Sequence, residues 1–502
     1  MLRHKVLTSG MVGLVTMWLE GCGGGGLNTS TGTLGSISNP SSPSTTGSSS
    51  SGWSSPRSLY TANNLPNSGA QSPMMAADAQ GDLVAAWLQG MDVNGDIGVF
   101  VSRYQASTLT WSTPLQVDTT SRLGISASSP ALVMDSAGNA TLAWIQNTAQ
   151  QIPALWAVHF SVFNAVVTPP AKVDQSLSTG AGSSQPVLSV EGADQAVVAW
   201  MQDEGTGNYV KLSAYTNGVW SIPQDVASPV SQIGSPSSPQ VTSDASGHVT
   251  LVWLQPLSNG SLSVAARQWQ QGTFTSTLAY VDTLTLPGNG ASAPLAVTDS
   301  AGHVDVVWIQ GVNNASTGIV PSLYSSVLAA GATQWSAPQE VDSSAGSGGS
   351  GHAQMLADTS GNAWVVWEQA TAGLAPMNHL YVKAVSASGV WVSPTLINSG
   401  VLFPSGVGVT AGPLLTIDNM GNQNVSWVTS DPPMSSIPVV YNSQHKVSIG
   451  LWTAPTQVNT TGYYAQGVSA LATAVAPSSG VLYALWTQFN GMQNQIFYSQ
   501  LP

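Results

Sequence analysis

Carboxylates are the side chains of this sequence whose type and placement come nearest to catalysis. Two of them held a few ångströms apart, one as acid and one as base or nucleophile, are what glycosidases use to cleave sugar bonds. The candidates are scattered between strand-like stretches: Asp92, Asp96, Asp203, Glu204, Glu368 and Asp431. Their spacing does not decide whether two of them meet, and scattered loop carboxylates are ordinarily solvated. We therefore predict no catalytic residue, with a glycoside hydrolase or lyase as the alternative.

One string resembles a metal site. Asp92, Asn94 and Asp96 match the first, third and fifth ligand positions of a calcium-binding loop. Ile97 stands where that loop needs glycine, and Arg103 stands where it needs the bidentate glutamate. An Asn-Gly turn between two strands explains the same residues. We predict no metal site and no cofactor.

The elements that position these side chains are set by a repeat. Tryptophan recurs eight times at intervals of 53 to 60 residues, six times with aspartate and once with glutamate nine residues earlier. Glycine stands six residues before seven of them. The recurring residues are Trp87, Trp144, Trp200, Trp253, Trp308, Trp367, Trp427 and Trp486. Self-similarity at such a period indicates a repeat architecture.

Each repeat has the pattern of four short strands. In the second repeat a strand ends at Asp135, a turn includes Gly138, and the partner strand carries Trp144. Aspartate can accept backbone N–H groups of the turn, and glycine takes the left-handed conformation that such hairpins need. The tryptophans are predicted to wedge between sheets. A glutamine follows seven of them by two residues and is predicted to bond to the backbone, with a ligand-binding polar ring as the alternative.

The fourth strand opens with Trp-Ser/Thr-x-Pro, as at Trp111 and Trp335, and the last repeat lacks this motif. The motif stands instead at Trp53, ahead of the first repeat. An N-terminal strand that completes the last blade closes a ring of four-stranded sheets and protects their edges. The sequence therefore predicts an all-β, eight-bladed β-propeller of antiparallel blades over residues 53–502.

A ligand site is expected where the ring is least regular. Loops on a rigid scaffold usually carry binding, and propeller ligands commonly sit at the mouth of the central channel, on the face that carries the blade-to-blade crossings. The longest segments between second and third strands are residues 311–322 and 369–378. We predict that a ligand contacts blades five and six at His352, Glu368, Asn313 and His379; the alternative is that these are tolerated surface insertions.

Two families resemble the repeat. Turn aspartates and blade tryptophans are similar to the Asp-box repeats of sialidases, but both spacings are longer here, and the dispersed arginines do not match the arginine cluster of a sialidase. Residues 53–502 more closely resemble bacterial fucose-binding propeller lectins and uncharacterised propeller lipoproteins. This resemblance implies binding or scaffolding, with carbohydrate or a protein partner as ligand, and no sugar-binding residue carries over by position. An envelope-assembly factor is a further alternative.

The N-terminus resembles a bacterial lipoprotein signal. A short basic region ending at Lys5 precedes an apolar stretch, and Leu19-Glu-Gly-Cys22 has the form of a lipobox, although Glu20 is unusual there. The resemblance implies cleavage after residue 21 and acyl chains, including palmitate, on Cys22, the single cysteine. Gly23 favours sorting to the outer membrane by the same analogy. Residues 22–52 form an uncharged Gly/Ser/Thr/Pro tether that spans roughly 30 Å on average.

Charge excludes one class of partner. Loss of Arg3, Lys5 and Glu20 with the leader leaves 8 basic and 22 acidic side chains, taken from 10 and 23, for a net charge of −14. Nucleic-acid binding needs a positive surface, so we expect none. The partners we expect are the membrane, through Cys22, and a glycan or an envelope protein, with the chain a monomer facing the periplasm or the cell surface.

Overall fold

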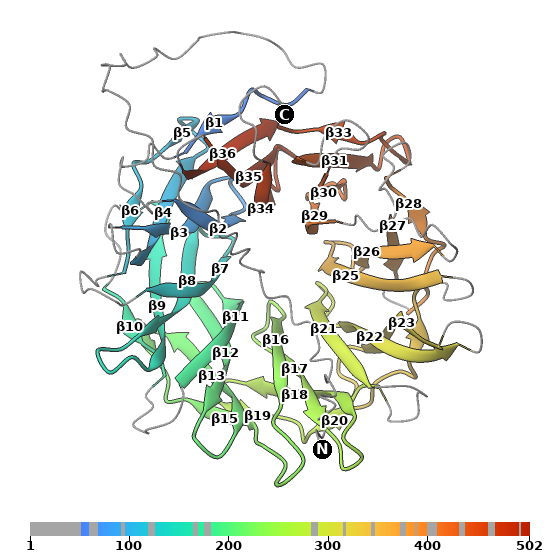
Figure 1. The fold of residues 1–502 in the computed structure, drawn as a ribbon. Helices are drawn as coiled ribbons and strands as arrows, with labels where there is room; N and C mark the ends of the chain where they lie inside the picture. The colour runs from blue at the N-terminus through green and yellow to red at the C-terminus, as the bar shows by residue number, and fades with distance from the viewer. Residues whose placement is uncertain are drawn as a thin grey trace, which may run out of the picture.

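The computed structural model is an all-β ring of eight sheets (Figure 1). It describes residues 52–59, 69–91, 96–118, 126–163, 169–174, 182–282, 290–314, 318–342, 347–371, 378–386, 389–398, 409–430, 437–459, 467–490 and 493–502. The predicted leader, Cys22 and nearly all of the tether lie outside these residues. In the described ranges no helix is long and apolar enough to cross a membrane.

The first four blades each run from an innermost to an outermost strand. Their strands are β2 (Ala70–Ala77), β3 (Leu83–Gly90), β4 (Ile97–Gln105), β5 (Thr110–Trp111) and β6 (Leu115–Gln116); β7 (Ala127–Met134), β8 (Asn139–Asn147), β9 (Pro153–Ser161) and β10 (Ala171–Lys172); β11 (Gly182–Gly192), β12 (Gln195–Asp203), β13 (Asn208–Thr216), β14 (Val219–Trp220) and β15 (Gln224–Ala227); and β16 (Ser237–Ser243), β17 (Val249–Pro256), β18 (Leu262–Gln270), β19 (Thr273–Phe274) and β20 (Ala279–Tyr280).

The other four blades follow the same order. Their strands are β21 (Ala291–Thr298), β22 (Val304–Asn314), β23 (Gly318–Leu328) and β24 (Gln339–Glu340); β25 (Ser347–Ala357), β26 (Ala363–Thr371), β27 (Asn378–Val385) and β28 (Thr395–Leu396); β29 (Ala411–Ile417), β30 (Gln423–Ser430), β31 (Pro438–Lys446), β32 (Leu451–Trp452) and β33 (Thr456–Gln457); and β34 (Val468–Val475), β35 (Leu482–Phe489), β36 (Asn494–Leu501) and β1 (Arg57–Ser58). The outermost strand is split into two short segments in blades one, three, four and seven.

The ring is closed by the N-terminal strand, as predicted. β1 pairs antiparallel with β36 in the eighth blade (Figure 1). The Ser499 hydroxyl donates to the Ser54 carbonyl oxygen over 2.6 Å, and the Ser54 hydroxyl accepts the Gln500 N–H over 3.1 Å. Blade one makes the same reciprocal contact between Ser102, Arg103 and Ser112. The serine of the Trp-Ser-x-Pro motif therefore fastens the fourth strand to the third, both within blades and at the closure.

The eight recurring tryptophans lie between neighbouring blades, as predicted. Each is at most 1% exposed. Trp144 of blade two, for example, packs in one apolar cluster with Val84 and Val99 of blade one. Because every sheet buries this side chain against the preceding one, the core is a series of interfaces around the ring.

The turn aspartates organise the hairpins between first and second strands. The Asp299 carboxylate is 2% exposed, and its Oδ1 accepts the N–H groups of Ala301 over 2.9 Å and His303 over 2.8 Å. Gly302 follows with φ of +86°, a conformation that glycine adopts freely. The carboxylates thus satisfy turn amides rather than facing a ligand.

Asp299→Ala is expected to lower the free energy of unfolding by about 1 kcal/mol, because two turn N–H groups lose their acceptor. Chemical denaturation measures this loss. Ser136→Ala, at an exposed position directly after the equivalent Asp135, is the control and should leave the midpoint unchanged. An Asp299→Ala protein of unchanged stability that had lost a ligand would show that these carboxylates bind rather than fold.

Candidate functional site

The innermost strands are bent by a bulge near the end that carries the crossings. The bulge residue has a φ between 47° and 53° in blades one to six, although none of the six is glycine. In blade seven Gly412 takes this place with a φ of 88°. The residues are Ser72, Ser129, Gln185, Ser238, Ala293 and His352. A bulge re-aims a side chain, and a left-handed non-glycine residue persists only where its surroundings hold it. All six lie within the first strand of their blade.

His352 and Glu368, both predicted site residues, meet at the bulge of blade six. The imidazole Nδ1 lies 2.6 Å from the Glu368 Oε2 atom. The other oxygen, Oε1, accepts the N–H of Val409 in the chain that enters blade seven, over 3.2 Å. The Glu368 side chain is 8% exposed, whereas that of His352 is 50% exposed. A buried carboxylate therefore holds a half-exposed imidazole in one orientation.

This contact sets the protonation of the imidazole. The hydrogen bond with Glu368 raises the pKa of His352 above its ordinary value, against the opposing effect of burial. Nδ1 is committed to Glu368, so the imidazole has Nε2 left for an external group. Below the raised pKa Nε2 is an N–H donor, and above it Nε2 is an acceptor.

The remaining predicted residues are placed differently. His379 pairs with Gln369, while Glu368 pairs with Leu380. Because side chains alternate along a strand, His379 lies on the opposite face of blade six from Glu368. The ring of His379 lies 6.2 Å from that of Tyr381, centroid to centroid. The side chain of Asn313 lies outside the described residues. The structure thus brings together two of the four predicted residues.

One predicted loop is wrong. Residues 311–322 were expected to form an irregular connection, but β22 and β23 continue through most of them. Gly311 pairs with Pro321, and the ladder extends to Asn314 opposite Gly318. Val312 and Val320 pair across this hairpin, a β-branched pair that suits strands, whereas the length of the segment alone had suggested a loop. In blade six, β26 extends to Thr371, and residues 372–377 lie outside the described part.

The recurring glutamines bond to the tryptophans, and the predicted bond to the backbone is present at Gln202, whose Nε2 donates to the Asp203 carbonyl oxygen over 3.3 Å. In seven blades the glutamine Oε1 accepts the indole N–H two residues earlier, over 2.8 to 3.3 Å. Period-two spacing already placed both groups on one side of the strand. Blade seven has Thr429 instead, and the Trp427 Nε1 has no acceptor among the described residues. The glutamines therefore satisfy buried donors, which argues against a ligand-binding ring.

In blades one, two, four and five the outer strand is followed by Val-Asp, and these four aspartates, Asp118, Asp174, Asp282 and Asp342, are buried at the crossings. Asp282 accepts the Val264 N–H over 3.1 Å and the Ser263 hydroxyl over 2.5 Å. Asp342 accepts the Ser350 hydroxyl, and burial raises the pKa of its carboxyl to about 6. These carboxylates tie one blade's third strand to the crossing that follows it.

Other described carboxylates near the crossing face are also engaged. Asp203 accepts the Gly205 N–H over 2.7 Å, and Glu204 lies 2.5 Å from the Lys211 Nζ. Asp96 is buried, while Asp92, Asn94 and Asp431 lie outside the described residues. Across the described ranges no three His, Cys, Asp or Glu side chains gather to hold a metal ion.

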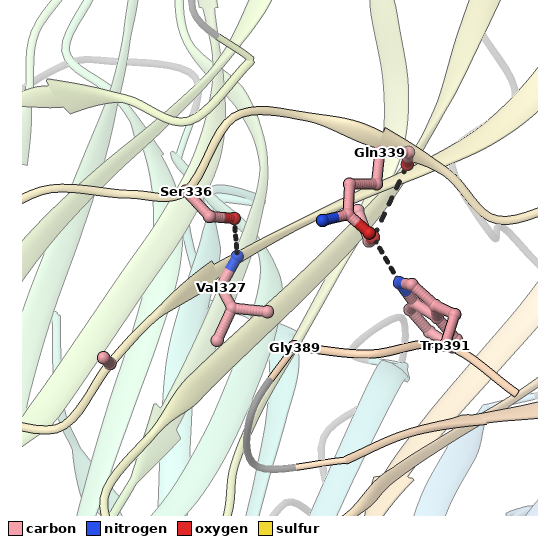
Figure 2. A pocket seen from close by; sticks show the side chains of 7 residues that line it. Val327, Ser336, Gln339, Gly389 and Trp391 are labelled. Carbon is pink, nitrogen blue, oxygen red and sulfur yellow. Dashed lines mark hydrogen bonds between the residues drawn. The ribbon is translucent and has the colours of Figure 1, made fainter.

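A groove of about 190 Å³ lies elsewhere, between the outer strands of blades five and six (Figure 2). Its polar atoms serve contacts within the ring: the Trp391 indole donates to the Ser325 hydroxyl over 2.9 Å, and the Ser336 hydroxyl accepts the Val327 N–H over 3.0 Å. The four predicted site residues do not line it. The candidate site is therefore the His352–Glu368 pair, at the inner strand.

No protein-family model matches the chain, and no curated protein matches it. Solved structures of similar fold include the BP39L lectin from Burkholderia pseudomallei, at 15% identity and a TM-score of 0.41, over 77% of this chain and 99% of that chain. Polysaccharide lyase Uly1 is 10% identical, with a TM-score of 0.40 over 84% of this chain and 88% of that chain. The Hadza microbial sialidase Hz136 is 14% identical, with a TM-score of 0.37 over 59% of this chain and 63% of that chain. The match therefore spans less than two thirds of that sialidase.

Proposed function

We propose that this chain is a membrane-anchored, extracytoplasmic binding propeller that recognises carbohydrate at the crossing face of blade six. The observation that supports this is the oriented His352 imidazole. Its Nδ1 contacts the buried Glu368 carboxylate, while half of the His352 side chain remains exposed. A fixed hydrogen-bonding group beside uncharged neighbours suits hydroxyl-rich ligands. The bulge positions of the two neighbouring blades, five and seven, are occupied by Ala293 and Gly412.

Binding is favoured over hydrolysis by the state of Glu368. Both of its oxygens already accept hydrogen bonds, one from a backbone N–H and one in the contact with His352. A general acid or nucleophile must instead reach the scissile bond with a free oxygen. With Asp203 and Glu204 also engaged, paired-carboxylate chemistry has little support among the described residues.

The membrane anchor is proposed from the sequence. Cys22 is the single cysteine, it follows a lipobox-like Leu19-Glu-Gly, and an uncharged tether separates it from the ring. Two or more acyl chains provide stable attachment. The Gly after the cysteine favours the outer membrane.

Glycan-array binding followed by titration of the best polysaccharide tests the site. His352→Ala is expected to weaken binding at least tenfold, about 1.4 kcal/mol. His248→Ala is the matched control: His248 pairs with Asp244 over 2.7 Å and its side chain is 53% exposed, but it lies on the face with the aspartate turns. Equal affinities for both variants and the parent protein would place the site elsewhere.

The same titration should depend on pH. If Nε2 donates to the ligand, affinity is full below the raised pKa of His352 and falls as pH rises through it. Glu368→Gln removes the charge that raises this pKa, so the midpoint should move to lower pH, which imidazole NMR signals can follow directly. Release of reducing ends from the polysaccharide would instead support a hydrolase or lyase. Capture of one envelope protein without glycan binding would support a protein partner.

A further inference from the structure

Blade seven exposes a contiguous apolar tip. Met420, Val447, Ile449 and Leu451 are 61%, 55%, 65% and 69% exposed. Met420 lies in the aspartate turn, Val447 and Ile449 lie in the hairpin between β31 and β32, and Leu451 is the first residue of β32. The two turns meet, because the Val447 N–H donates to the Asn422 Oδ1 over 3.0 Å. Single exposed apolar residues are ordinary, but a group of four on one projection indicates a contact surface.

Charge on this tip suits a lipid surface. Its exposed ionisable side chain is Lys446, directly before Val447. The nearby Asp418 is 3% exposed, and its oxygens accept N–H groups of Met420 and Asn422. The tip therefore presents apolar side chains beside a cation and keeps its carboxylate covered, although the chain as a whole is strongly acidic.

The described chain also begins at this part of the ring. Gly52 lies against Leu501, at the end of β36, on the face that carries the aspartate turns. Trp53 packs with Val440 and Val458 of blade seven. The turns of blades seven and eight are joined by the Asn419 N–H, which donates to the Pro477 carbonyl over 3.1 Å. The tether therefore leaves the ring between blades seven and eight, beside the apolar tip.

We propose that the apolar tip docks onto the lipid bilayer, with Met420, Val447, Ile449 and Leu451 entering the interface and Lys446 at the headgroup phosphates. This rests on the proposed anchor at Cys22, since a tether of roughly 30 Å keeps the tip close to the lipid and makes a weak apolar contact effective. The aspartate-turn face then lies against the membrane. The crossing face, with His352, points away from it, toward ligands in solution.

The test uses the full lipidated protein on vesicles of phosphatidylethanolamine and phosphatidylglycerol. Ile449→Cys places a thiol on the tip for an environment-sensitive nitrobenzoxadiazole dye. Ile222→Cys is the control, because Ile222 is 75% exposed and lies in blade three, on the opposite side of the ring (Figure 1). On vesicle attachment, the dye at position 449 should shift its emission to the blue and lose several-fold in quenching by iodide, while the dye at position 222 should not change.

The outcomes separate the docking surface from the anchor. If both labelled variants attach to vesicles and iodide quenches the dye at position 449 as strongly as the dye at position 222, the docking surface is wrong and the anchor stands. If each chain takes up two dyes, one of them on Cys22, and the protein fails to attach to vesicles, the anchor is wrong and the docking is wrong with it. Protection at position 449 without vesicles, rising with protein concentration, would assign the tip to a second copy of the chain and overturn the lipid proposal.

Discussion

Trp53→Ala is expected to lower the free energy of unfolding by about 3–5 kcal/mol, the range for removing a fully buried tryptophan side chain. Trp53 is 2% exposed and packs among Ala411, Val428 and Val440 of the neighbouring blade. It also positions Ser54, which fastens to Ser499 and Gln500. Loss of the indole therefore weakens both an interface and the closure of the ring.

A control separates those two effects. Trp111→Ala removes the equivalent side chain of blade one, which contacts Tyr498 of blade eight, but its strand follows directly from β4 in the same blade. Both variants should lose stability in denaturant. Only Trp53→Ala, or more completely deletion of residues 52–59, should uncover the edge of β36 and promote association between chains, detected by sedimentation. A deletion protein that stays monomeric with an unchanged melting temperature would contradict closure by this strand.

Cys22→Ala is expected to convert a membrane-bound protein into one that remains in the soluble fraction or keeps its leader. In the proposed anchor the Cys22 thiol is the acyl acceptor, and the described residues contain no helix long and apolar enough to cross a membrane. Without acyl chains, the apolar tip alone gives at most weak and reversible attachment.

Palmitate labelling and membrane fractionation measure this loss. Ser48→Ala, in the uncharged tether, is the control and should leave labelling and fractionation unchanged. Palmitate incorporation that survives Cys22→Ala would rule out the anchor. If labelling is lost completely but vesicle binding is undiminished, the tip of blade seven rather than the acyl chains attaches the protein to the membrane.

The propeller was predictable because its decisive signals repeat. Eight buried tryptophans, the aspartate turns and the Trp-Ser-x-Pro motif each occur often enough that Trp53 could be assigned to the last blade from its sequence alone. The bulges were not predictable, because Ser72 and Ala293 carry no preference for positive φ. Their conformation comes from the register shift between the first and second strands and the packing of neighbouring blades.

The candidate site was predictable in part. His352 and Glu368 were predicted because they flank the irregular segments of blades five and six, with His352 opening blade six and Glu368 standing directly before residues 369–378. That they touch depends on the pairing of Gly351 with Glu368, a register that spacing does not reveal. His379 was misplaced for the converse reason, since a shift of one residue along a strand moves a side chain to the other face.

The contact between Ser54 and Ser499 joins residues 445 positions apart in the sequence. Synthesis proceeds from the N-terminus, so the strand that completes the eighth blade emerges before all of the blades, and its partner, β36, emerges after the first seven. Blades one to seven can form from local hairpins as they appear, but the eighth stays open until residues 494–501 are available. During that interval an unpaired strand and the tryptophan at position 53 are exposed, so the chain is most prone to associate with other chains just before the eighth blade closes.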